Sequence, residues 1–231
     1  MMLRWQALVD IVLALLLTIG GASLVPLLGV SLVGRFNLPI LLVLMLQGVV
    51  ILAGLWALLA WRGQRWHQIG LLPLRGKDFL LAFMALLAVF ALNLVLNTAI
   101  GLFWPDLLEA HQRQLSGVAK VLAGSLPLAA VAGAMMFVGF YEEVLARGFL
   151  LTRSLTLLSG VWGPVLLSSL LFGLGHAYQG GIGVIQTALV GIVFARLALH
   201  WGTLWPVILA HAALNTLSLA VLRLSKIAAS S

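Results

Sequence analysis

Two adjacent carboxylates, Glu142 and Glu143, and the guanidinium of Arg147 lie in a run that is otherwise apolar. Ionisable groups at membrane depth are costly, and they usually mark a functional site. Glu143 and Arg147 stand four residues apart with the acid first, which favours an ion pair on one helix face. Consecutive helical residues point about 100° apart, so Glu142 is left without a local cation. A desolvated carboxylate without a partner suits a general base or acid near neutral pH. The alternative is that all three groups are solvated at a helix end.

Two further residue pairs have the same spacing of four. Phe172 and His176 are separated by Gly-Leu-Gly, and on one helix face the aromatic ring can orient the imidazole. His211 and Asn215 form a polar stripe on an apolar helix. Hydrogen-bonding groups that face one way in hydrocarbon need a partner or a substrate. The sequence therefore predicts that His176, His211 and Asn215 converge on Glu142. The alternatives are a packed core histidine and hydrogen bonds between helices.

The elements that must position these residues are apolar throughout. Of the 231 residues, 63% are hydrophobic and 8% are charged, whereas soluble domains carry about 25% charged residues. We therefore expect one integral membrane domain, residues 1–231, with its motif-bearing core at about residues 121–222. The net charge of +7 resides mostly in short loops, so we expect no nucleic-acid partner. The chain has no cysteine, which excludes disulfides and thiol chemistry.

The apolar runs predict an all-α, polytopic transmembrane helix bundle of about seven to eight spans, since a helix needs roughly 20 residues to cross a bilayer. The predicted spans are Trp5–Leu32, Leu38–Trp61, Phe79–Trp104, Val121–Leu151, Val161–Ala177, Ile182–Trp201 and Leu204–Leu222. An eighth segment would fit inside the long fourth run. A cleaved secretory signal is the alternative for the first run, although its length favours a span.

Basic residues in the loops predict the orientation of the bundle. The loop between the second and third spans is expected in the cytoplasm together with the N-terminus, because it carries Arg62, Arg65, Arg75 and Lys77. The stretch from Pro105 to Lys120 is then an external loop that contains His111, and Arg153 returns to the cytoplasmic side. With seven spans the C-terminus lies outside, although Arg223 and Lys226 argue against this side.

The remaining intramembrane polar residues have a simpler interpretation. Asn93 and Asn97 stand four residues apart on the third span, where they could pack helices or line a cavity. Gln186 and Thr187 are interpreted as groups that form hydrogen bonds between helices.

In this order, the motifs of the chain resemble those of the CPBP family: Glu142-Glu143-x-x-x-Arg147, Phe172-x-x-x-His176 and His211-x-x-x-Asn215. This family comprises CAAX prenyl endopeptidases and bacteriocin-processing intramembrane proteases, and it is also called the Abi family. The resemblance covers about Tyr141–Asn215, whereas the first 120 residues are similar only in being apolar spans. It implies a compact member in the plasma membrane of a bacterium or archaeon, acting on a membrane protein or peptide substrate.

The resemblance also implies roles for the motif residues. Glu142 and His176 would activate the hydrolytic water, and His211 and Asn215 would stabilise the oxyanion. Glu143, Arg147 and Phe172 would give structural support. If a metal such as zinc takes part, its ligands would be Glu142, His176 and His211; the unpaired Glu142 favours a reaction without a metal.

Two other functions remain compatible with these motifs. A proton-coupled membrane transporter could use the same carboxylate and histidines as a proton relay. A non-catalytic family member could act in bacteriocin immunity or as a scaffold. The substrate, the cleavage site and the oligomeric state are not set by the sequence.

Overall fold

The computed structural model describes residues 2–36, 40–123 and 126–230, and within these ranges the chain forms helices and no β-strand. The α-helices are α1 (Arg4–Phe36), α2 (Ile40–Trp61), α3 (Gly76–Phe103), α4 (Pro105–Ala123), α5 (Leu128–Glu143), α6 (Leu151–Leu157), α7 (Trp162–Leu174), α8 (Gly180–Trp201) and α9 (Trp205–Ser230). Shorter helical segments are η1 (Trp66–Ile69), η2 (Val144–Leu150) and η3 (Ala177–Gln179). The predicted all-α fold class is confirmed.

Six segments of the described chain are long and apolar enough to cross a membrane. They are Arg4–Gly21, Leu41–Trp61, Gly76–Phe103, Leu128–Leu157, Ala177–Trp201 and Trp205–Arg223. The predicted span Val161–Ala177 is not among them, because α7 has only 13 residues. At 1.5 Å per residue α7 is about 20 Å long, which is less than the roughly 30 Å of the hydrocarbon core. The predicted start of the second span, Leu38, lies outside the described residues.

The stretch from Pro105 to Lys120, predicted as an external loop, is instead part of the helix α4. Proline is well tolerated in the first helical turn, and Asp106 there complements the positive end of the helix dipole. The apolar face of α4 is formed by Leu115, Val118, Ala119 and Leu122. The opposite face carries the exposed ion pair between Glu109 and Arg113. The mixed charges of this stretch therefore belong to the polar face of an amphipathic helix.

The carboxylate pair lies inside one continuous helical segment, Leu128–Leu157, which is made of α5, η2 and α6. This segment begins and ends later than the predicted fourth span. Its middle part, η2, is π-helical, and the N–H of Leu151 bonds to the carbonyl of Ala146, five residues back. Short π-helical turns are rare and are frequent at functional sites. Here the turn begins directly after Glu143, so it shifts the register of every later residue on this segment.

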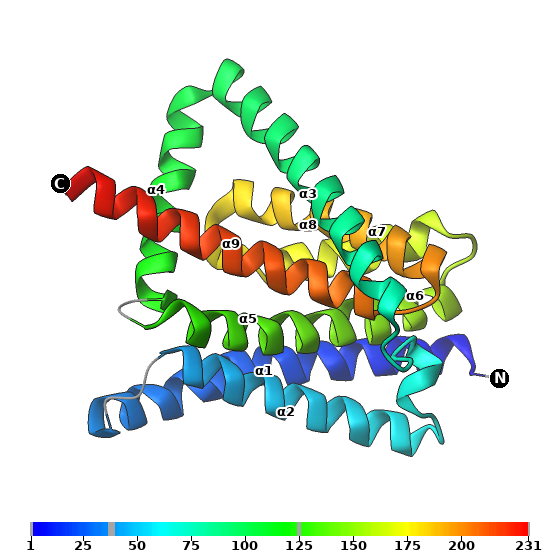
Figure 1. Ribbon diagram of the computed structural model, residues 1–231. Helices are drawn as coiled ribbons and strands as arrows, with labels where there is room; N and C mark the ends of the chain where they lie inside the picture. Colours follow the sequence, from blue (N-terminus) through cyan, green and yellow to red (C-terminus); the bar gives the residue numbers. More distant parts are fainter. Residues whose placement is uncertain (1, 37–39, 124–125, 231) are drawn as a thin grey trace.

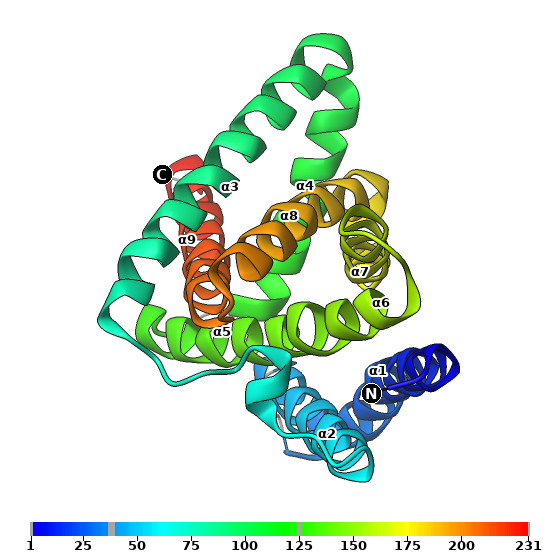
Figure 2. The same ribbon diagram turned by 90° about the vertical axis from the view of Figure 1, so that its right-hand side faces the viewer.

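The helix α5 occupies the centre of the bundle (Figures 1 and 2). The α1–α2 hairpin lies on one side of it, and α9 packs against the other side. The helices α7 and α8 form a second hairpin beside α9. The helix α3 packs along α9 and then diverges from it, and α4 returns from the far end of α3, so that the two form a V (Figure 1). This arrangement places the end of α5, the end of α7 and the middle of α9 around one region.

A buried ionic cluster joins α1 to the end of α2 and to α6. Asp10 accepts hydrogen bonds from Arg62 at 2.9 and 2.7 Å and from Arg153 at 2.9 Å. Arg153 also donates to the side-chain oxygen of Gln64 at 2.6 Å. Arg153, predicted to return to the cytoplasmic side as a loop residue, is only 2% exposed. It is therefore a structural group of the bundle interior.

The two ends of the chain lie at opposite ends of the bundle (Figure 1). The connection between α2 and α3, which carries the cluster of basic residues, lies at the same end as the N-terminus, and α4 lies toward the end of the C-terminus. The six candidate spans are fewer than the seven to eight predicted, and six crossings alone would return the chain to its starting end. The opposite placement of the two ends therefore requires one further traverse of the bundle. The side that faces the cytoplasm stays a prediction.

Candidate active site

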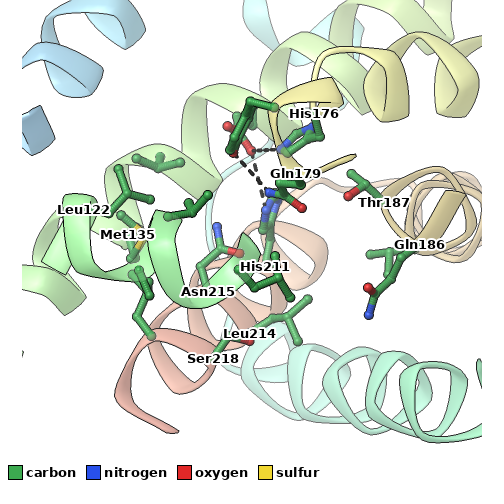
Figure 3. Close-up of a pocket in the computed structure, with 18 of the residues that line it drawn as sticks. Leu122, Met135, His176, Gln179, Gln186, Thr187, His211, Leu214, Asn215 and Ser218 are labelled. Atoms are coloured by element: carbon green, nitrogen blue, oxygen red, sulfur yellow. Dashed lines mark hydrogen bonds and ion pairs between the residues drawn. The ribbon is translucent and has the colours of Figure 1, made fainter. Parts of the chain in front are cut away.

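Glu142 and the two histidines predicted to meet it come from three different elements. Glu142 lies in the last turn of α5, His176 follows the end of α7, and His211 lies on α9. The Oε2 atom of Glu142 is 3.9 Å from Nε2 of His176 and 3.5 Å from Nε2 of His211 (Figure 3). This oxygen is buried and accepts no hydrogen bond from the described residues. The three side chains thus surround a single point.

Asn215 lies one turn beyond His211 on α9 and lines the same cavity (Figure 3). In the described part of the chain its amide makes no hydrogen bond to Glu142 or to either histidine. Asn215 therefore lies in the cavity wall without holding the other three side chains.

Glu143 and Arg147 form the ion pair that their spacing predicts. Arg147 donates to Oε1 of Glu143 at 2.6 Å, and both side chains are buried. The guanidinium also lies over the ring of Phe172, 4.1 Å from its centroid. The same oxygen of Glu143 accepts a second hydrogen bond, from Nδ1 of His211 at 2.7 Å. Sequence reasoning missed this bond because it joins α5 to α9 across 68 residues.

The spacing of Phe172 and His176 predicts that both lie on one helix. This prediction is wrong, because α7 ends at Leu174, before His176. The two rings are nevertheless in contact, with centroids 4.7 Å apart. The Nδ1 atom of His176 is bonded to the carbonyl oxygen of Phe172 at 2.9 Å. A Cβ at Gly173 would lie 2.7 Å from a carbonyl oxygen of α8. The glycine therefore lets α7 pack tightly on α8 just before the chain turns to present the histidine.

The partners of the two Nδ1 atoms determine how the imidazoles face Glu142. A backbone carbonyl can only accept a hydrogen bond, so Nδ1 of His176 donates. Glu143, paired with Arg147, is also an acceptor, so Nδ1 of His211 donates as well. Each neutral imidazole therefore presents an unprotonated Nε2 toward Glu142. The separations of 3.5 and 3.9 Å exceed the length of a normal hydrogen bond, so neither imidazole is bonded directly to Oε2 of Glu142.

Two glycines set the distances between helices around these contacts. A Cβ at Gly139 on α5 would lie 3.0 Å from a backbone nitrogen of α9, so the helices that carry Glu143 and His211 approach closely. A Cβ at Gly191 on α8 would lie 3.2 Å from Nη2 of Arg147. The absence of a side chain at Gly191 therefore leaves room for the guanidinium.

Two cavities meet at Glu142. One of about 220 Å³ lies mainly between α3, α4, α5, α8 and α9 and has several polar side chains on its wall. The other, of about 600 Å³, lies mainly between α2, α4, η2 and α7 and is largely apolar. Both walls include Leu44, Val118, Leu122, Tyr141, Glu142, Phe172, His176 and Tyr178. The carboxylate can therefore be reached from two directions.

Residues outside the three motifs contribute to the smaller cavity. Gln186 donates to Asn93 at 2.9 Å, as its interpretation as a group that bonds between helices predicts. His111, predicted in a loop, is a buried residue of α4 whose Nε2 bonds to Oε1 of Gln186 at 3.1 Å. Thr187 lines this cavity, and Tyr178 lines both cavities. Sequence reasoning did not single out Tyr178, and its position two residues after His176 is the only available signal.

A metal site was one expectation for Glu142, His176 and His211. Imidazole nitrogens and a carboxylate are a donor set that zinc accepts, and histidine ligands usually donate their other N–H to a carbonyl or a carboxylate. In the described ranges, however, no group of three or more His, Cys, Asp or Glu side chains is arranged to hold a metal ion. The expected reaction without a metal, with zinc as the alternative, stays a prediction that needs a chemical test.

Comparison with known proteins finds one family to which the motif region is similar. Residues 124–217 match the model of the Rce1-like family, described as type II CAAX prenyl endopeptidase Rce1-like. No curated protein and no solved structure matches the chain. The matched region contains all three motifs. Over residues 124–217, the chain is thus similar to the Rce1-like family, in agreement with its resemblance to the CPBP family.

Proposed function

We propose that the protein is an intramembrane endopeptidase in which Glu142 activates a water molecule. The supporting observation is the placement of Oε2 of Glu142 between the Nε2 atoms of His176 and His211, at the junction of two cavities. The site lies within a bundle of long apolar helices, so its substrate is a membrane protein or a peptide that enters the membrane. The similarity of residues 124–217 to a family of endopeptidases supports the same reaction class.

The first step is attack on the peptide carbonyl. A water molecule bound between Glu142 and His176 donates one proton toward Oε2 and one toward Nε2 of the imidazole. As the water oxygen forms a bond to the carbonyl carbon, Glu142 accepts the proton, and the carbonyl oxygen becomes an oxyanion. General-base assistance of this kind contributes about 10²–10⁴-fold to a rate.

His211 and Asn215 are the proposed partners of the oxyanion. Because Nδ1 of His211 donates to Glu143, its Nε2 can donate only when the ring carries both protons. The carboxylate of Glu143 lies behind the ring and stabilises the positive charge of that form, as the buried acid does in catalytic triads. The amide of Asn215 supplies a neutral donor from the same face of α9.

The second step breaks the peptide bond. Glu142 returns its proton to the nitrogen of the tetrahedral intermediate, the C–N bond breaks, and the oxyanion collapses to a carboxyl group. The products are one chain with a new C-terminal carboxyl group and one chain with a new N-terminal amine. One water is consumed, and Glu142 is regenerated as a carboxylate.

The decisive experiment compares two Glu→Gln variants of the protein reconstituted in liposomes. Glu142→Gln removes the proposed base with little change of shape, and Glu109→Gln changes an exposed carboxylate on α4. With an internally quenched peptide library as the probe, we expect Glu142→Gln to lower the cleavage rate by about 10²–10⁴-fold. We expect Glu109→Gln to cleave at the parental rate.

Parental activity in a folded Glu142→Gln variant would refute the role of this residue. Proton-driven uptake of a solute by the parent, without cleavage of any peptide in the library, would support the transporter instead. Incubation with a strong zinc chelator separates the two forms of the hydrolytic mechanism. Loss of cleavage that added zinc restores would overturn the metal-independent form while leaving the peptidase reaction in place.

A further inference from the structure

Three polar side chains outside the family motifs form a hydrogen-bonded row at the smaller cavity. Asn93 on α3 and Gln186 on α8 line the cavity, and His111 on α4 is bonded to Gln186 without lining it. In the view of Figure 3, Gln186 and Thr187 lie on the side of α8, away from Leu122 on α4. The row connects three helices, and none of its members belongs to the family motifs.

The hydrogen bonds within the row determine which groups stay available. The carbonyl oxygen of Gln186 accepts from His111 at 3.1 Å, and its amide nitrogen donates to the carbonyl oxygen of Asn93 at 2.9 Å. Gln186 is therefore fixed at both ends. The two N–H groups of Asn93 and the second N–H of Gln186 have no bonded acceptor among the described side chains. The unused groups of the row are thus mainly donors.

Hydrogen-bond donors in an apolar surrounding favour the binding of a ligand that carries hydrogen-bond acceptors. A polypeptide that enters a cavity inside the membrane loses the water that solvated its backbone carbonyl groups, and each carbonyl then needs a donor. Side-chain amides supply such donors, and they do not titrate, so they do not compete with Glu142 for protons. The row is held rigidly by its own hydrogen bonds, which reduces the entropy lost when it binds a ligand.

We propose that Asn93 and Gln186 form a subsite that binds backbone carbonyl groups of the polypeptide on one side of the cleaved bond. His111 is a positioning residue, because it holds Gln186 in the orientation that points its amide nitrogen toward Asn93. This proposal rests on the proposed peptidase function and adds the group through which that site holds its substrate. Because the subsite would bind the substrate backbone, we expect the substrate residue bound there to tolerate different side chains.

Simple packing between helices is the competing explanation for the row. Amides that serve only to join helices can be fully buried, whereas Asn93 and Gln186 are half-buried and face the cavity. Asn97 stands one turn further along α3 and is also half-buried, but it is not among the residues that line either cavity. It provides a matched control on the same helix.

The test measures binding without cleavage, in the Glu142→Gln background, with protein in lipid nanodiscs. The probe is a fluorescein-labelled pool of octapeptides made of Ala, Leu, Val and Ser. Asn93→Asp keeps the oxygen that accepts from Gln186 and replaces the donor nitrogen, and Asn93→Ala removes the donor without adding charge. We expect both variants to weaken binding about tenfold, as loss of one hydrogen bond does. Asn97→Asp and Asn97→Ala are expected to bind within twofold of the parent.

A second probe identifies the backbone carbonyl. In octapeptides with a single ester in place of one amide, the carbonyl is a weaker acceptor, so the ester at the position bound by Asn93 should reduce binding. We expect the ester to weaken binding to the protein that has Asn93 and to leave binding to the Asn93→Ala variant unchanged. Such dependence of one substitution on the other is expected of two groups in direct contact. Equal ester penalties in both proteins would overturn the proposal, as would equal binding by the Asn93 and Asn97 variants. Weaker binding that appears only with a lower unfolding temperature would assign the row to packing.

Failure of this subsite is distinguishable from failure of the peptidase reaction. If the parent cleaves peptides and the Asn93 variants bind the probes normally, only the subsite is refuted. If binding depends on Asn93 and the parent cleaves none of the probes, the subsite is supported and the peptidase reaction is refuted for these peptides.

Discussion

Glu142 and Glu143 are neighbours in the sequence, but their carboxylates have different partners. Glu142 faces two imidazole nitrogens beyond hydrogen-bond distance, with its side chain 18% exposed. Glu143 is fully buried and accepts hydrogen bonds from Arg147 and His211 through one oxygen. The proposed base therefore keeps an oxygen available for water, while its neighbour fixes an imidazole and balances a buried cation.

The role of Glu143 can be separated from its contribution to stability. Glu143→Gln leaves the guanidinium of Arg147 buried without a counter-ion, which costs about 3–5 kcal/mol of folding stability. We expect the variant to unfold at a lower temperature in detergent and to lose activity. The double variant Glu143→Gln/Arg147→Met removes both charges, and we expect it to recover most of the stability, because apolar residues often replace a buried ion pair without loss.

Cleavage assays on the double variant then test whether Glu143 orients the imidazole of His211. Without the carboxylate behind His211, we expect the rate to stay at least about 100-fold below the parental rate, since removal of the buried acid of a catalytic triad costs about 10⁴-fold. Recovery of parental cleavage together with stability would show that Glu143 only balances Arg147.

Residue types and spacing predicted much of this site, and the unpredicted parts have physical reasons. The pair of Glu143 and Arg147 is local to one helical segment, so its spacing was sufficient. The bond from His211 to Glu143 is a tertiary contact, for which one sequence carries no distance information. The direction of His176 depends on where α7 ends, and helix ends are the least certain part of such predictions.

At the scale of elements, the close contact between α5 and α9 holds the two main parts of the site together. Gly139→Ala would place a Cβ 3.0 Å from a backbone nitrogen of α9, where no flexible side chain can yield. We expect α5 and α9 to separate slightly and to lengthen the bond from His211 to Glu143. Small misplacements of catalytic groups cost up to about 100-fold in rate, so we expect cleavage to fall by about tenfold or more.

Gly133→Ala is the matched control for this substitution. Gly133 lies on the same helix, and a Cβ there meets no atom within 4 Å. We expect parental cleavage and a slightly higher unfolding temperature, because alanine favours a helix over glycine by about 1 kcal/mol. Cleavage assays and thermal unfolding of both variants check the prediction, and equal cleavage by both would show that the α5–α9 distance does not limit the reaction.

The elements themselves were predicted with uneven success. Long apolar runs identified the spanning helices, because hydrocarbon imposes both composition and length on them. Helix α4 was not predicted because the mixed charges of this stretch are typical of a loop outside the membrane, although Leu115, Val118 and Leu122 recur at helical spacing. The π-helical turn of η2 has no sequence signal that distinguishes it from an α-helix. Within this turn, Gly148 approaches Ile69 and Leu204 so closely that a Cβ there would lie 3.1 Å from both side chains.

At the scale of the whole molecule, the ionic cluster at Asp10 secures the N-terminal hairpin to the motif-bearing region. Asp10→Asn would leave the guanidinium groups of Arg62 and Arg153 without their shared counter-ion. We expect a loss of about 3–5 kcal/mol in folding stability, measured by thermal unfolding in detergent. Asp106→Asn, in the exposed first turn of α4, should cost about 0.3–1 kcal/mol through the helix dipole. Equal unfolding temperatures for the two variants would contradict a structural role of the cluster.

The larger cavity has a consequence for how such a protein can diversify. The groups that fix the two histidines come from α5, η2, α7 and α9, whereas α2 and α4 supply another part of the cavity wall through Leu44, Gln47, Ile51, Gly117 and Val121. Substitutions in α2 or α4 can therefore reshape the space offered to a substrate without touching the hydrogen bonds around Glu142. In the proposed peptidase, substrate choice and bond cleavage would thus be encoded largely in different stretches of the chain, so that one could change through descent while the other is kept.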